Sequence, residues 1–235
     1  MKTIADNITF IKERIDKAAN GRPVTLVAVT KTFSADCVRE ALACGVADIA
    51  ESKIQEALPK FEVLSGELQH INKHFIGHLQ SNKAKKAVLN FDLIQSLDSI
   101  SLAKDINRHA KEINKIQKCL IELKVSSEQT KTGADEESVS AIYEYCKENC
   151  ENIVIDGIMT IAPYFDDKEQ VRPYFKKAFN VFTNLQKKYN DNNFKILSMG
   201  MSDDFEIAIQ EGANMVRVGS AIFGERIYDK QEVLR

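Results

Sequence analysis

The 235-residue sequence has no excess of basic residues: 32 Lys and Arg stand against 34 Asp and Glu, giving a net charge of −2 at pH 7. A protein that neutralises nucleic-acid phosphates needs such an excess, so nucleic acid is not expected as a partner. There is also no signal-peptide-like start and no apolar run near the roughly 20 residues of a membrane span. With 44% hydrophobic and 28% charged residues, the chain is predicted to be a globular, cytoplasmic protein without membrane contact.

Cysteine and glycine motifs of several common sites are missing too. The five cysteines are odd in number and form no C-x-x-C, which argues against a disulfide framework and a zinc ribbon. His74 and His78 lie in a segment predicted as a strand, where their rings would be ~13 Å apart, so no metal site is predicted. The sequence contains no G-x-x-x-x-G-K-[ST], G-x-G-x-x-G or G-x-S-x-G, which argues against P-loop, dinucleotide-binding and hydrolase sites.

What the sequence does contain is a repeated alternation of short apolar runs and longer amphipathic segments, as in βα units. No Pro-, Gly- or Ser-rich linker divides it, so one domain is predicted over residues 1–235. A helix is expected at Ile4–Ala19, before the first strand. Eight runs are predicted as strands: 24–30, 48–51, 74–77, 93–96, 119–125, 154–161, 196–199 and 215–218.

The spacing of these runs favours a closed fold. Residues 24–224 give about 25 residues per unit, enough for a strand, two short loops and a three-turn helix. We therefore predict an α/β protein, a single (β/α)8 TIM barrel with an extra N-terminal helix; an open doubly wound sheet is the alternative. In such a barrel the functional site lies at the C-terminal ends of the strands.

Lys31 directly follows the first predicted strand, which places an amine at that end of the barrel. A partly desolvated lysine there would lose some preference for its charged form and could attack a carbonyl as a nucleophile. The competing interpretation is a solvated lysine in the loop after a strand.

Small residues after the last two strands form a candidate anion site. Ser202 is predicted to cap a helix that continues with early acidic residues, and Ser220 follows Gly219. The loops after strands seven and eight are the usual phosphate site of these barrels. The competing interpretation is that the glycines only permit turns and Ser202 only caps its helix.

Strands one and eight are neighbours in a closed barrel, so Lys31 and this anion site would face one cavity. A phosphorylated aldehyde fits both, and pyridoxal 5'-phosphate (PLP) is such a molecule. Strand alternation places Arg217 on the face of Gly219, where it could meet the pyridine nitrogen and disfavour a protonated ring. An outward arginine paired with an acidic residue is the alternative.

Five segments carry a resemblance to a known family: 29–32 (VTKT), 75–83 (FIGHLQSNK), 157–160 (GIMT), 197–204 (LSMGMSDD) and 216–224 (VRVGSAIFG). They resemble the YggS/PROSC family of pyridoxal phosphate homeostasis proteins, collinearly over about residues 22–228. The resemblance implies a fold like the N-terminal barrel of alanine racemase. It implies a Schiff base at Lys31, Arg217 at the pyridine nitrogen, and a phosphate surrounded by Met201, Ser202, Gly219 and Ser220.

Two further positions bear on the site. Members of this family usually have Gly-Glu-Asn after the second strand, whereas this chain has Ala50-Glu51-Ser52. Serine offers one donor where the asparagine amide offers two, so Ser52 is a weaker candidate for cofactor contact. Lys131, in the loop after strand five, is either a second amine at the same mouth or a solvated loop lysine.

The resemblance implies a protein that holds PLP and takes part in vitamin B6 and amino-acid homeostasis without strong turnover; no catalytic residue is assigned. The chain ends at Arg235, without the second domain that supplies a catalytic tyrosine in the related racemases, so efficient racemisation is not expected. A weak PLP-dependent amino-acid racemase and a lysine Schiff-base aldolase are the alternatives. Expected partners are PLP and PLP-dependent apoenzymes, with the chain a monomer or weak homodimer.

Overall fold

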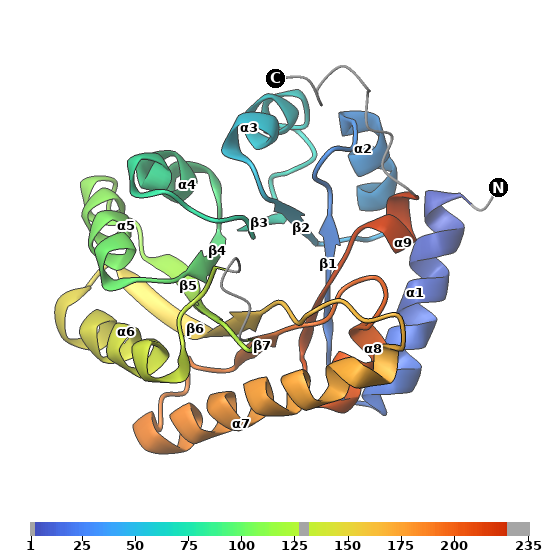
Figure 1. The fold of residues 1–235 in the computed structure, drawn as a ribbon. Coiled ribbons are helices and arrows are strands. Elements are labelled where there is room, and N and C mark those ends of the chain that lie inside the picture. Colours follow the sequence, from blue (N-terminus) through green and yellow to red (C-terminus); the bar gives the residue numbers. More distant parts are fainter. Residues whose placement is uncertain (1–2, 127–131, 225–235) are drawn as a thin grey trace, which may run out of the picture.

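The computed structural model describes residues 3–126 and 132–224, which form a closed barrel of parallel strands in the order β1 to β8, surrounded by helices (Figure 1). The predicted (β/α)8 barrel is thereby confirmed, and the open sheet is excluded. The strands are β1 Thr25–Val29, β2 Asp48–Glu51, β3 Asn72–Phe75, β4 Leu93–Leu97, β5 Gln117–Leu123, β6 Ile153–Thr160, β7 Ile196–Ser198 and β8 Met215–Val218.

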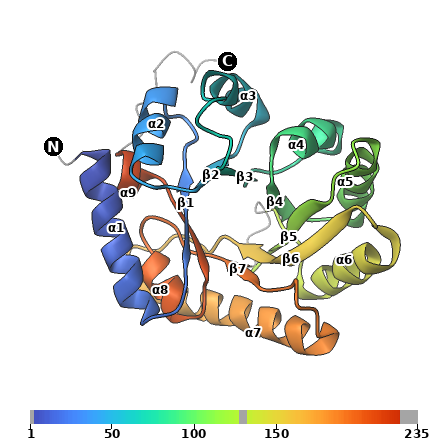
Figure 2. The same ribbon diagram turned by 180° about the vertical axis from the view of Figure 1, so that it is seen from behind.

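An α-helix lies between each strand and the next one along the chain, and α9 follows β8. The helices form the outer layer, which is seen from both sides in Figures 1 and 2. The α-helices are α1 Ile4–Ala19, α2 Ala35–Ala43, α3 Ile54–Val63, α4 Ala84–Asn90, α5 Ile100–Glu112, α6 Glu136–Asn149, α7 Arg172–Tyr189, α8 Phe205–Gln210 and α9 Ser220–Phe223. Two 3-10 helices are η1 Ser81–Lys83 and η2 Lys168–Val171. None of the helices in the described parts of the chain combines the length and apolarity that a bilayer crossing requires.

The barrel closes because β1 pairs in parallel with β8, with Val27 opposite Arg217. Alternation along β1 separates two apolar layers. Val27 and Val29 belong to a cluster inside the barrel, whereas Ala28 packs in the layer between strands and helices. The seam between the first and last strands therefore contributes side chains to one interior.

The predicted N-terminal helix α1 covers this seam, beside α8 and α9 (Figure 1). It begins with a capping box between Thr3 and Asp6, which satisfies N–H groups that the helix itself leaves unpaired. The buried residues of α1 recur at helical spacing, which fixes its inner face. A hydrogen bond from Asn7 to the Ile222 carbonyl (2.9 Å) and an Arg14–Glu206 ion pair (2.6 Å) link α1 to the C-terminal units.

Strand positions differ from the prediction mainly at their ends. The third strand is Asn72–Phe75 rather than 74–77, because residues 72 and 73 pair with β2 while residues 76–78 leave the sheet. His74 is therefore buried inside the fold, and half-exposed His78 lies 3.4 Å from Asp98. The prediction that both rings lie on one strand is wrong, because β3 ends at Phe75.

Candidate functional site

A cavity of about 240 Å3 opens at the C-terminal ends of the strands, between the ends of β1 and β8. It brings together six of the seven predicted site residues, which come from positions far apart in the sequence. Its lining consists of Val29, Lys31, Ile76, Ile161, Met201, Ser202, Asp203, Arg217, Gly219 and Ser220.

Lys31 is half-buried, two residues beyond the end of β1. The backbone around it is unusual, because Thr32 has a φ of 70°. A β-branched residue in this left-handed region costs about 1–3 kcal/mol. Such strain persists only where the surrounding structure imposes it, and strained residues cluster at functional sites. The Thr30 carbonyl accepts hydrogen bonds from the Phe33 N–H (3.2 Å) and Lys60 Nζ (2.7 Å), which holds this turn in place.

The turn after β8 approaches β1 closely. A Cβ on Gly219 would lie 3.3 Å from Val29 Cβ and 3.4 Å from the Val29 carbonyl oxygen, which is tighter than most such contacts. Glycine therefore allows the turn that begins α9 to lie against Val29, the last residue of β1. This packing brings Lys31 and the candidate anion site around Gly219 to one cavity, as predicted.

Ser202 does not cap α8, the helix that follows it in the sequence, contrary to the prediction. Helix α8 begins at Phe205, and Asp204 occupies its N-cap position without a side-chain capping bond. The Ser202 hydroxyl oxygen instead accepts the N–H groups of Gly219 (3.2 Å) and Ala221 (3.3 Å). Tertiary contact with the turn after β8 offers two donors at once, so the side chain turns there, and its own O–H remains to donate.

Arg217 points into the barrel, and the alternative of an outward arginine is excluded. It is 3% exposed and donates to Ser198 Oγ (2.7 Å) and the Thr160 carbonyl (2.9 Å), both neutral acceptors. Among the described residues, no carboxylate oxygen lies within ion-pair distance of it. Burial lowers the pKa of Arg217 to about 10, with Asp204 and Glu122 opposing that shift, so the group stays cationic at neutral pH.

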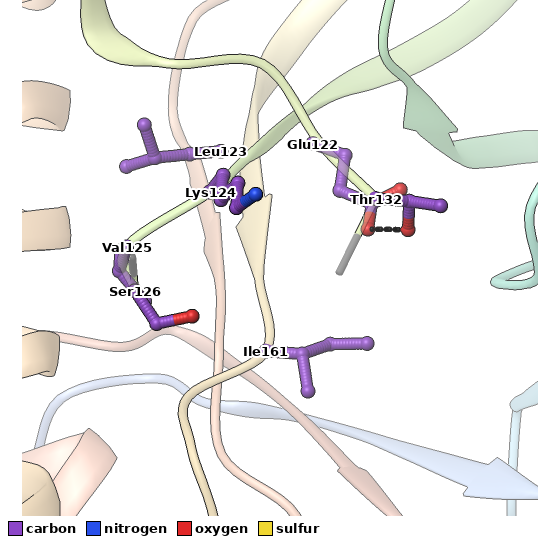
Figure 3. A pocket seen from close by; sticks show the side chains of 7 residues that line it. All are labelled: Glu122, Leu123, Lys124, Val125, Ser126, Thr132 and Ile161. Atoms are coloured by element: carbon purple, nitrogen blue, oxygen red, sulfur yellow. Dashed lines mark hydrogen bonds between the residues drawn. The ribbon is translucent and has the colours of Figure 1, made fainter. Parts of the chain in front are cut away.

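A second cavity of about 250 Å3 lies over β5 and β6 and shares Ile161 with the first (Figure 3). Glu122 lies beside it, 5% exposed, and accepts a hydrogen bond from Thr132 (2.8 Å), drawn in Figure 3. Burial raises the pKa of Glu122, and the Thr132 bond partly offsets this. Lys124 also lines this cavity, so a second amine lies near the mouth. No motif in the sequence marks Glu122, Lys124 or Thr132, so they were not predicted as site residues.

Among the described residues, one predicted position is not brought into the first cavity. Ser52 does not line it; its carbonyl oxygen lies against Gly77, where a Cβ would come within 2.0 Å. A cofactor contact from Ser52 stays a prediction. Lys131 lies outside the described residues.

Comparison with known proteins identifies the family of this chain. The family model of the alanine racemase N-terminal domain matches residues 1–227. The "Pyridoxal phosphate homeostasis protein" of Aquifex aeolicus is 41% identical over 228 residues, covering 95% of this chain and 98% of that protein. The chain belongs to the pyridoxal phosphate homeostasis protein family. The human member is 36% identical over 239 residues, covering 94% of this chain and 86% of that protein.

Solved structures place this homeostasis-family chain among similar barrels. PipY of Synechococcus elongatus PCC7942, solved with PLP bound, is 33% identical with a TM-score of 0.85, covering 94% of this chain and all of that one. Alanine racemase of Clostridium difficile 630 is 21% identical with a TM-score of 0.67, covering 95% of this chain and 58% of that one. The second likeness shows the shared barrel alone.

Proposed function

We propose that this chain binds PLP in the cavity at the C-terminal mouth and takes part in vitamin B6 and amino-acid homeostasis. Lys31 would hold the aldehyde carbon as a Schiff base, with release of water. Ser202, Gly219 and Ser220 would surround the phosphate beside Met201, and Arg217 would meet the pyridine nitrogen. PLP, when bound, supplies a reactive aldehyde and an aromatic ring that can withdraw electrons.

The observation that carries this proposal is the buried Arg217, which has no carboxylate partner among the described residues. A buried charge without a counter-ion is costly, so such a charge is retained where a ligand completes it. The same cavity contains the half-buried Lys31 and the Ser202 hydroxyl. Both cations suit a ligand with anionic groups, and the amine suits an aldehyde. Family membership and the PLP-bound structure of PipY support the same ligand.

We also propose that turnover is weak. Arginine does not give up its proton readily, so Arg217 at the pyridine nitrogen leaves that nitrogen unprotonated. An unprotonated ring is a weaker electron sink, and most PLP-dependent steps at the amino-acid α-carbon depend on that sink. The absence of appreciable proton exchange at the α-carbon of amino acids would separate this protein from a weak racemase, which must exchange that proton in each turnover.

The direct experiment is to incubate the protein with PLP, record its absorption spectrum, reduce it with borohydride and locate the labelled peptide by mass spectrometry. We expect label at Lys31 and none in Lys31→Ala. Lys124→Ala is the matched control, because Lys124 lies at the adjacent cavity, and it should label as the unaltered chain does. Label that remains in Lys31→Ala, or moves to Lys124, would overturn the assignment. A protein with no PLP label that still cleaves phosphosugars would be the aldolase instead.

A further inference from the structure

Arg217 is the first member of a chain of side-chain hydrogen bonds that crosses the inside of the barrel. Ser198 Oγ lies 2.7 Å from Arg217 and 2.7 Å from Gln95 Oε1. Gln95 Nε2 lies 2.8 Å from His74 Nδ1, and His74 Nε2 lies 3.0 Å from Asp48 Oδ1. These residues belong to β8, β7, β4, β3 and β2, and all but Asp48 are buried.

The donors of this chain all point in one direction. Arg217 has no acceptor atom, so it must donate to Ser198, whose single hydroxyl proton is left for Gln95 Oε1. Gln95 then presents its Nε2, which only donates, to His74 Nδ1. A rotated Gln95 amide would make Ser198 accept twice and leave its hydroxyl proton without Gln95 as acceptor. The geometry therefore selects one orientation of this amide.

The same reasoning fixes the state of His74. Its Nδ1 must accept from Gln95 and so carries no proton, which places the ring proton on Nε2, where it donates to the Asp48 carboxylate. Asp48 begins β2, so the chain runs from the C-terminal cavity to the opposite end of the barrel. A neutral, Nε2-protonated imidazole is the state that satisfies every bond.

We propose that Ser198 and Gln95 are positioning residues for Arg217, which they orient toward the ring of the ligand through this one-directional chain. The proposal rests on the proposed PLP site for its effect on the ligand. Ser198 and the Thr160 carbonyl hold two of the five N–H groups of Arg217 from one side. The other three N–H groups have no hydrogen bond among the described residues, and Arg217 lines the cavity. No contact between Ser198 or Gln95 and the ligand is required.

The first experiment compares Ser198→Ala with Ser96→Ala. Ser96 is equally buried, and its hydroxyl has no hydrogen-bond partner among the described residues, so this control removes the same atom without touching the chain. In Ser198→Ala we expect borohydride labelling at Lys31 to persist. PLP affinity should fall roughly three- to tenfold, and the 15N signal of ring-labelled PLP should shift. Ser96→Ala should change neither. Equal ring signals and affinities in both variants would overturn the positioning role.

The second experiment needs no PLP. In 15N-histidine spectra of the whole chain, with His74 assigned by its loss in His74→Gln, we expect Nε2 protonated and Nδ1 bare. Gln95→Glu keeps the shape but presents a carboxylate oxygen to Nδ1, which should move a proton onto that nitrogen. A ring with Nδ1 already protonated in the unaltered chain, or unchanged by Gln95→Glu, would overturn the chain's direction. Absence of Lys31 labelling in the unaltered chain would instead reject the proposed PLP site.

Discussion

Two buried cations in this barrel differ in what surrounds them. Lys60 of α3, with a 9% exposed side chain, donates to Glu51 Oε1 at 2.5 Å and to the Thr30 carbonyl at 2.7 Å. Arg217 is as deeply buried but donates to neutral oxygens. The first charge is paired with a carboxylate inside the protein, whereas the second lines the cavity and has no carboxylate within ion-pair distance among the described residues. Burial of a charge alone therefore does not distinguish the two cations; the distance to the nearest carboxylate does.

The Lys60 pair also shows how the fold supports the site without entering it. Thr30 donates to Glu51 Oε1 (2.7 Å), so one carboxylate joins the end of β1 to α3 just before Lys31. Burial raises the pKa of Glu51, and Lys60 opposes the shift. The ion pair with Lys60 therefore favours the ionised form of Glu51, which burial disfavours.

Removal of the Lys60 charge should have the largest effect on stability. In Lys60→Met the Glu51 carboxylate loses its partner while it stays buried, so the free energy of unfolding should fall by roughly 3–5 kcal/mol, measured by urea denaturation. Lys73→Met is the control, because Lys73 pairs with a half-exposed Asp92 and should change that energy by about 1 kcal/mol or less. A Lys60→Met variant as stable as this control would show that the pair is not what anchors β1 to α3.

Replacing the other cation should affect binding more than folding. Arg217→Met breaks no ion pair among the described residues, since Asp204 and Glu122 act on Arg217 only from beyond ion-pair distance, so it should lose less stability than Lys60→Met. It removes charged donors from the cavity, so PLP affinity should fall about ten- to a hundredfold, measured by titration of the absorption spectrum. Arg39→Met, at an exposed pair with Glu67, should leave the affinity unchanged. Unchanged affinity in Arg217→Met would remove the main support for the site.

Glu122 acts on Arg217 without an ion pair between them, and its effect on stability should depend on pH. Burial raises the folded-state pKa of Glu122, so its contribution to stability is present below its unfolded pKa and is lost as pH rises through the folded one. Glu122→Gln keeps an acceptor for Thr132, so its stability should rise relative to the unaltered chain between pH 4 and pH 7. Urea denaturation at both pH values measures this difference.

Glu67 provides the opposite sign as a control. Its hydrogen bond to Arg39 lowers its pKa, so Glu67 contributes stability at neutral pH that is lost as pH falls through the lowered value. Glu67→Gln should therefore lose stability relative to the unaltered chain as pH rises. If Glu122→Gln followed the same trend as Glu67→Gln, Glu122 would have to be paired in the folded protein.

The smallest effect is expected at Ser52. Because Ser52 does not line the cavity, Ser52→Ala should change PLP affinity by less than about twofold, measured by the same titration. Ser202→Ala is the comparison, since Ser202 lines the cavity and should weaken binding more. A larger loss in Ser52→Ala than in Ser202→Ala would restore position 52 as a cofactor contact.

Much of this architecture could be predicted from local patterns. The eight apolar runs and the helix Ile4–Ala19 follow from periodicity, which depends only on neighbouring residues. Strand alternation placed Arg217 on the face of Gly219 but left an inward and an outward side chain as alternatives, and the structure shows the inward one. Strand ends were predicted less well, as at β3, because pairing with β2 rather than local composition decides where the strand starts.

Other features depended on contacts between distant segments. Ser202 has the sequence context of a cap for the helix that follows it. Its hydroxyl oxygen instead accepts hydrogen bonds from two N–H groups after β8. No pattern in the sequence connects His74 with Gln95, and only the closed barrel places them in one chain with Ser198. No spacing rule in the sequence relates residues of β3, β4 and β7 across the interior.

The sequence by itself determined the eight strands, the N-terminal helix and the end of the barrel where Lys31 lies. These follow from repeat length and side-chain alternation, which are properties of short segments. The tertiary structure decided which side chains share the cavity, which buried cation has a carboxylate partner and which way the interior hydrogen bonds run. Those depend on distances between strands that meet only when β8 pairs with β1.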